Sequence, residues 1–276
     1  MAESYSDLQQ LFKNQAKTRV FSCLDSNNGR SHEIDKKDVV LFYKHYCDTC
    51  FGKDFSTWDH LPILGLSEKV EKHIPVIGDF TIKYDHDIPQ PYDESLVNEI
   101  IKTYQHVIKT NVDVEGEGEN ICVVLKSKEW YEQGKTCIRI RLQFPYCRVK
   151  KDVVNSFINP LIIDLLEKNA ITSMYSDKIE GGWNGSLKDI SDYVTMYGST
   201  DTPKKIPPLL FVGVYLEEDI NGNCQIIELE NVYTHEKHSF FVKDKCESGD
   251  VDIINEECDI EDDYAFSCYT LPIFLS

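Results

Sequence analysis

The sequence predicts a mixed α/β protein of the α+β type, and three observations carry this prediction. The chain has 276 residues, of which 41% are hydrophobic, so it can bury one large core or two smaller ones. Apolar residues recur at helical spacing over residues 96–110. By contrast, residues 73–84 are rich in β-branched and aromatic side chains, and residues 136–144 alternate apolar side chains with arginines, as strands do.

The first part of the chain predicts two helices separated by a strand and a turn. Residues 4–17 place Leu8, Leu11 and Phe12 on one helical face. The stretch "RVFSCL" favours a strand, and "DSNNGRSHEI" after it is typical of a turn. Asp35 is a predicted N-cap for a helix over residues 36–51.

The rest of the chain alternates strand, helix and loop signals. In order, we expect a strand over 73–84, a loop over 85–95, a helix over 96–110, an acidic turn over 111–120, strands over 121–127 and 136–144, a helix over 153–169, a strand over 207–219 and a hairpin over 220–242. Pro160 is expected to interrupt or restart its helix. Trp183, in "GGWNGS", is predicted to be a half-buried loop anchor.

Charge and cysteine usage limit the classes of function. The formal net charge is −18, which argues against strong autonomous nucleic-acid binding, although a local basic stripe remains compatible with it. No secretory signal or spanning apolar run is recognisable, so we expect an intracellular protein, not secreted and without a membrane partner. The ten cysteines are then expected to be reduced, with Cys47 and Cys50 forming either half of a zinc site or a pair of buried thiols.

Several segments, in order, resemble one protein family. They are "KTRVF", "DVVLFYKHYCDTCF", "PVIGDFTIKY", "YDESLVNEIIKTY", "ICVVLK", "IRIRLQFPYCRV" and "MYGSTDTP". The set resembles the N-terminal primase domain of the D5-like primase–helicases of large DNA viruses (nucleocytoplasmic large DNA viruses), within the archaeo-eukaryotic primase superfamily. The resemblance implies a primase-like core, with an N-terminal α/β unit and an RRM-like antiparallel sheet flanked by helices. We expect this domain over residues 1–243 and an acidic C-terminal tail over residues 244–276.

The resemblance also implies an active site that this sequence departs from. The family has an Asp-x-Asp pair after "PVI" that holds divalent metal, and here Asp79 and Thr81 stand at those positions. The family has a phosphate-contacting histidine before "FP", where this chain has Arg141, and a small residue where this chain has Arg139. A third acid is expected before "MYGS".

The third acid has three candidates, Asp177, Asp189 and Asp192. A competing alignment uses Asp85 and Asp87 as the acid pair, but these also fit solvated turn residues. On the first alignment no metal ligand set is expected, whereas an active site would need Mg²⁺ or Mn²⁺.

One local concentration of basic residues invites two interpretations. It consists of Arg139, Arg141, Arg148, Lys150 and Lys151. These residues could line a groove for single-stranded DNA or a nucleotide, because arginine suits phosphate contacts. Alternatively, they form a sheet face that is paired with the surplus acids.

Three functions remain open at this stage. The first is a catalytically degenerate, replication-associated viral protein (a pseudoenzyme) that binds nucleic acid or protein. The second is an active metal-dependent primase or nucleotidyltransferase with a rearranged site. The third is a structural or virion protein that reuses the fold. Each would act in the host cytoplasm, in a virus factory or in the virion, with replication or virion proteins as partners.

Overall fold

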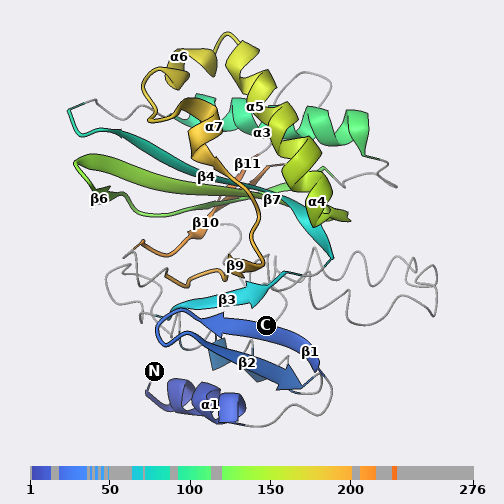
Figure 1. Ribbon diagram of the computed structural model, residues 1–276, viewed down its shortest axis with the longest axis vertical. Helices are drawn as coiled ribbons and strands as arrows, with labels where there is room; N and C mark the ends of the chain where they lie inside the picture. Colours follow the sequence, from blue (N-terminus) through green and yellow to red (C-terminus); the bar gives the residue numbers. More distant parts are fainter. Residues whose placement is uncertain are drawn as a thin grey trace. The chain divides into compact units, whose positions relative to one another are not determined.

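The computed structural model describes residues 2–13, 19–35, 38, 41–42, 45–46, 49, 64–70, 72–87, 93–112, 120–200, 206–215 and 226–228. The chain divides into two compact units (Figure 1). Unit 1 comprises Met1–Val70, Asp192–Pro208 and Glu230–Ser276, and unit 2 comprises Glu71–Ser191 and Leu209–Leu229. The domain boundary predicted at residue 243 lies outside the described residues.

Unit 1 contains a four-stranded antiparallel sheet in the order β2-β1-β3-β9. Its elements are α1 (Ala2–Lys13), β1 (Arg19–Asp25), β2 (Arg30–Asp35), β3 (Leu66–Lys69) and β9 (Tyr193–Thr195). The turn predicted over "DSNNGRSHEI" is present only in its first half, because Arg30–Asp35 forms β2. The Asp25 carboxylate accepts hydrogen bonds from Asn27 and Asn28 within this turn. Leu8 of α1 is fully buried.

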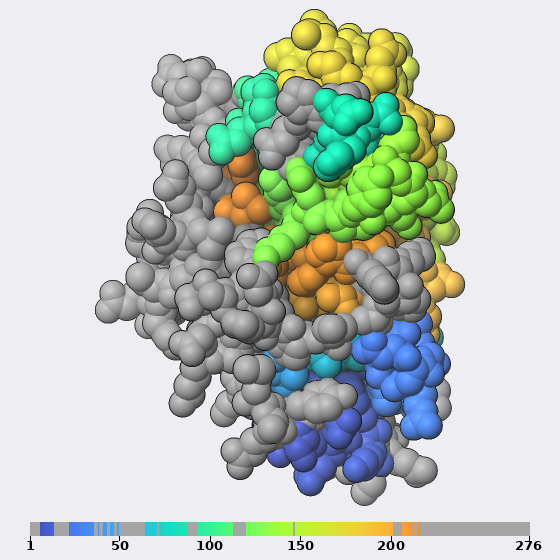
Figure 2. All heavy atoms as spheres, turned by 90° about the vertical axis from the view of Figure 1, so that its left-hand side faces the viewer, coloured from blue at the N-terminus to red at the C-terminus, as the bar shows by residue number. Residues whose placement is uncertain are grey.

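Unit 2 is built on a larger antiparallel sheet with the order β11-β10-β5-β7-β4-β8, and β6 pairs with β7. The strands are β4 (His73–Asp85), β5 (Cys122–Lys126), β6 (Trp130–Glu132), β7 (Lys135–Lys150), β8 (Leu187–Lys188), β10 (Leu210–Tyr215) and β11 (Ile226–Glu228). The long strands β4 and β7 pair along their whole lengths, with one register shift between Pro75 and Val76. In Figure 2 the green β6–β7 hairpin lies at the surface.

The helices of unit 2 lie on one side of this sheet (Figure 1). They are α3 (Glu94–Asn111), α4 (Lys151–Val153), the π-helix η3 (Val154–Ile158), α5 (Asn159–Lys168), α6 (Ser173–Ser176) and α7 (Gly182–Ser186). The predicted restart near Pro160 is confirmed, because a π-helical turn ends there and α5 begins with Pro160 in its first turn. Antiparallel sheets flanked by helices confirm the predicted α+β class.

One face of β4 is apolar and packs against α3. A Cβ atom at Gly78 would lie 2.5 Å from the hydroxyl oxygen of Tyr104, so only glycine lets α3 come this close. Phe80 is fully buried and meets the rings of Tyr104 and Trp183 edge-on, with 6.2 Å between centroids in each case. Because strand side chains alternate, Gly78 and Phe80 face the helices and Asp79 faces away from them.

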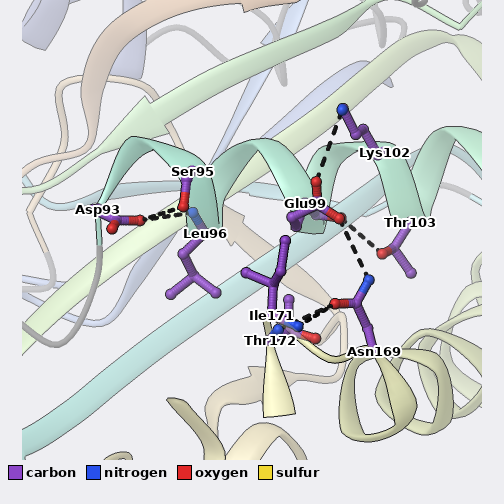
Figure 3. Close-up of polar contacts among 9 residues, drawn as sticks. All are labelled: Asp93, Ser95, Leu96, Glu99, Lys102, Thr103, Asn169, Ile171 and Thr172. Atoms are coloured by element: carbon purple, nitrogen blue, oxygen red, sulfur yellow. Dashed lines mark hydrogen bonds and ion pairs between the residues drawn. The ribbon is translucent and has the colours of Figure 1, made fainter. Parts of the chain in front are cut away.

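Polar contacts fix the start of α3 and its position against the end of α5 (Figure 3). The carboxylate of Asp93 caps the helix by accepting the Leu96 N–H at 2.9 Å. One turn later, Glu99 accepts a hydrogen bond from the side chain of Asn169, at 3.4 Å. Asn169 in turn accepts the backbone N–H groups of Ile171 and Thr172, so it orders the turn after α5. No helix in the described part of the chain is both long and apolar enough to cross a membrane.

Candidate functional site

Strand register places Asp79 between basic residues on both neighbouring strands. On β7, Arg141 is the direct partner of Asp79 and Arg139 is the direct partner of Thr81. On the other side, β8 pairs Lys188 with Asp79. The position that the resemblance assigns to a metal-binding carboxylate is therefore surrounded by cationic side chains.

Two of these cations bind the Asp79 carboxylate directly, and we call Asp79, Arg139 and Arg141 the Asp79 cluster. Arg139 is bidentate, with Nε 2.7 Å from Oδ1 and Nη2 2.6 Å from Oδ2. Arg141 contacts Oδ2 twice, through Nε at 3.0 Å and Nη2 at 2.7 Å. Oδ2 therefore accepts three of these N–H groups and Oδ1 accepts one, so both oxygens of the carboxylate are engaged by guanidinium groups.

The Asp79 cluster is buried, and its charges set the protonation state of Asp79. The Asp79 residue is 8% exposed and Arg141 is 1% exposed. Burial by itself raises the pKa of Asp79, but the neighbouring charges and hydrogen bonds of Arg139 and Arg141 outweigh it. The pKa of Asp79 therefore lies well below its usual value of 3.8, and the carboxylate stays ionised.

Thr81 lies two residues along β4 on the same face as Asp79 and is half-buried. Its hydroxyl is neutral and replaces the second carboxylate that the resemblance implies. Magnesium and manganese prefer oxygen ligands that carry negative charge. One carboxylate whose two oxygens are both bound by guanidinium groups, next to a threonine, does not fit a divalent metal.

None of the three candidates for a third acid is buried as Asp79 is. Asp177 and Asp189 are exposed residues of unit 2, and Asp192 belongs to unit 1. Asp189 follows Lys188 in a loop that Asn155 of the π-helix fixes, by exchanging two hydrogen bonds with the backbone of Ile190 at 2.8 and 3.0 Å. Among the described residues, no group of three or more His, Cys, Asp or Glu side chains is arranged to hold a metal ion.

The competing acid pair lies at the end of β4. Asp85 is the last residue of the strand and is exposed, and Asp87 lies in the turn after it. The carboxylate of Asp85 pairs with the ammonium of Lys135 at 2.7 Å, and Lys135 also lies 3.7 Å from Glu180. Their positions match the interpretation as turn residues and do not resemble a buried ligand pair.

The predicted basic concentration falls into two groups, one in the middle of β7 and one at the end of β7 and the start of α4. Arg139 and Arg141 are used by Asp79, as described above. Beyond the register shift, Arg148 donates a hydrogen bond to the carbonyl of His73 at 3.3 Å, Lys150 is exposed, and the Lys151 N–H donates to the carbonyl of Lys72.

Sequence reasoning missed Gln143, the third polar residue on the same face of β7. It follows Arg139 and Arg141 at two-residue spacing and is fully buried. Neither amide atom has a hydrogen-bond partner within the part of the chain that the structure describes. The alternation in "RIRLQF" carried this signal, because it places all three polar side chains on one face.

The cysteine prediction can be followed only in part. Cys23, Cys122, Cys137 and Cys147 are free and buried. The Cys47–Cys50 pair and the acidic tail over 244–276 lie outside the described residues.

Comparison with known proteins agrees with this architecture. The family model described as "C962R protein N-terminal AEP domain", where AEP denotes archaeo-eukaryotic primase, matches residues 23–210, more than half of the chain. The chain is also 24% identical over 181 residues to "Putative helicase 121R" of Invertebrate iridescent virus 3. That match covers 61% of this chain and 18% of the relative, so the chain spans under a fifth of the relative's length. The predicted resemblance is confirmed: this chain belongs to the family of the C962R protein N-terminal archaeo-eukaryotic primase domain.

Proposed function

We propose that this chain is a primase-like domain of a viral replication protein that has lost metal-dependent nucleotidyl transfer and acts as a binding module. The observation that carries the proposal is the Asp79 cluster. The one carboxylate at the family's metal-binding strand position is occupied by Arg139 and Arg141.

The chemistry explains why this arrangement opposes catalysis. Transfer to a 3′ hydroxyl by two metal ions requires carboxylates that bridge the metals and leave room for the triphosphate. Both oxygens of Asp79 already accept N–H groups from guanidinium side chains, and Thr81 supplies no charge. An approaching divalent cation would also meet the net charge of +1 that one carboxylate and two guanidinium groups leave.

Charge pairing favours a protein partner over nucleic acid. On β4 and β7, Lys83, Lys135, Arg139 and Arg141 each pair with a carboxylate. Affinity for nucleic acid comes largely from cations that are available to phosphates, and the chain as a whole carries a net charge of −18. Association with replication is supported by the viral relative whose name describes a helicase. Sites of action in the host cytoplasm, a virus factory or the virion follow from that proposal.

A primer-synthesis assay tests the loss of chemistry directly. The full chain is incubated with single-stranded template, nucleoside triphosphates and Mg²⁺ or Mn²⁺, and a single-stranded DNA titration at low salt runs beside it. We expect no primer product and weak DNA binding. Synthesis that disappears in Asp79→Ala, or in Asp85→Ala and Asp87→Ala, would establish the active-enzyme alternative and overturn the proposal.

A further inference from the structure

We propose that Arg139 and Arg141 take the place of the divalent cation itself, so that the Asp79 cluster is an ionic clasp between β4 and β7 that works without metal. This inference rests on the part of the proposed function that concerns Asp79, since it assumes that no metal binds there. It goes further by assigning the arginines a role: they supply the positive charge that the strand pair would otherwise take from a bound ion.

Charge balance supports the replacement of a divalent cation by the two arginines. Two guanidinium groups carry the same formal charge as one divalent cation, and they bring it on covalently attached side chains. Each guanidinium donates two hydrogen bonds to Asp79, at distances from 2.6 to 3.0 Å. Charge-assisted hydrogen bonds of this length are the strong ones, and bidentate geometry suits arginine better than lysine.

Position in the sheet explains why the cluster works as a clasp. The pairing of β4 with β7 runs from His73–Lys150 to Asp85–Lys135, and Asp79 lies midway along it. Arg141 binds Asp79 directly across the strands, whereas Arg139 reaches it diagonally from the position opposite Thr81. The clasp therefore links two successive register positions on one face of the strand pair, Asp79–Arg141 and Thr81–Arg139.

Thr81 provides the decisive position for a test. It is directly opposite Arg139, and an aspartate there would restore the second carboxylate of the family pattern. If the arginines replace the metal, Thr81→Asp alone should give a neutral cluster with two acids and two arginines and should still bind no metal. Only removal of both arginines should then create a metal site.

The experiment compares four forms of the full chain: wild type, T81D, R139M/R141M and T81D/R139M/R141M. Melting temperatures are measured in EDTA, Mg²⁺ and Mn²⁺, and Mn²⁺ binding is followed by calorimetry without nucleotide. We expect Mn²⁺ to shift the melting temperatures of wild type and T81D by less than about 1 °C. The triple variant should melt lower in EDTA and gain roughly 5 °C with Mn²⁺.

Two results would overturn the clasp: Mn²⁺ binding by wild type or T81D, or a folded triple variant that ignores Mn²⁺. Should the triple variant fail to fold, T81D still decides, because it keeps both arginines and adds the missing carboxylate. Lys135→Met serves as the matched control, since it removes the half-buried partner of the exposed acid Asp85 on the same two strands.

The outcome is separable from that of the proposed function. Mn²⁺ binding without primer synthesis would remove the clasp and leave the loss of catalysis standing. Primer synthesis that needs Asp85 and Asp87, together with no Mn²⁺ binding at Asp79, would contradict the proposed function and would not contradict the clasp.

Discussion

Asp79 and Asp85 lie on the same strand, and each faces a basic residue of β7 in register, yet their environments are opposite. Asp79 is buried and accepts four hydrogen bonds from two arginines. Asp85 is exposed at the strand end and accepts one from Lys135 at 2.7 Å. The comparison teaches that an acid–base pair on a sheet makes no fixed contribution to the free energy of unfolding. Burial and donor geometry determine how much stability is lost when the pair is removed.

The physical reason lies in solvation. Removing one partner of a buried ion pair leaves the other charged group in the interior without compensation. An exposed pair is weakened by water and salt, and its loss leaves two groups that solvent accommodates.

The largest effect is expected from Asp79→Asn. The substitution keeps the shape of the side chain but leaves two partly or fully buried guanidinium groups facing a neutral amide. We expect the free energy of unfolding to fall by about 3–5 kcal/mol, measured by urea denaturation. A loss below about 1 kcal/mol, equal to that of an exposed pair, would remove the contrast between the two acids.

A substitution at the residue next to Asp79 tests the opposite face of β4, which packs against α3. Gly78→Ala places a methyl group 2.5 Å from the Tyr104 hydroxyl oxygen and 2.6 Å from its ring carbon. We expect a loss of about 1–3 kcal/mol from overpacking, again by urea denaturation. Adding Tyr104→Leu should recover part of that loss, and no recovery would mean that position 78 is limited by something other than this ring.

Low pH should reduce the difference in unfolding free energy between wild type and Asp79→Asn. The pKa of Asp79 is lower in the folded chain than its usual value of 3.8, so the stability that the ionised group contributes is complete above that value. It is lost as the pH falls from there through the folded pKa. When unfolding free energies are measured from pH 7 to pH 2, those of wild type and Asp79→Asn should therefore converge only below about pH 4. Convergence already at pH 5–6 would contradict this assignment.

The smallest effect is expected from Asp85→Asn. Its exposed pair with Lys135 should contribute less than about 1 kcal/mol, and 1 M salt should remove most of that contribution. Denaturation at low and high salt checks both points. A salt-insensitive loss as large as that of Asp79→Asn would show that the strand end is more buried in solution than its exposure indicates.

Much of the fold could be predicted because its signals are local. The helix predicted over 96–110 is α3, and the strand predicted over 73–84 is β4, each within a residue or two. Trp183 was predicted as a half-buried loop anchor, and this was wrong. It lies in the short helix α7, is fully buried and donates from its indole to the carbonyl of Thr172. A five-residue helix that itself contains two glycines has no periodicity to detect.

The candidate site could be predicted only in its parts. Alternation places Arg139 and Arg141 on one face of a strand, and the family resemblance points to Asp79. Which residue pairs with which depends on the register of β4 and β7, strands joined through α3 and β5, and no local pattern encodes it. The diagonal reach of Arg139 to Asp79 is likewise a property of packing.

The most direct test of the central claim is a calorimetric titration of the full wild-type chain with Mn²⁺ and a nucleoside triphosphate, added separately and together. Replacement of the metal by Arg139 and Arg141 predicts no Mn²⁺ binding and no increase in triphosphate affinity when Mn²⁺ is present. Stoichiometric, Mn²⁺-dependent triphosphate binding that Asp79→Asn abolishes would contradict it, because Asp79 would then hold a metal despite both arginines.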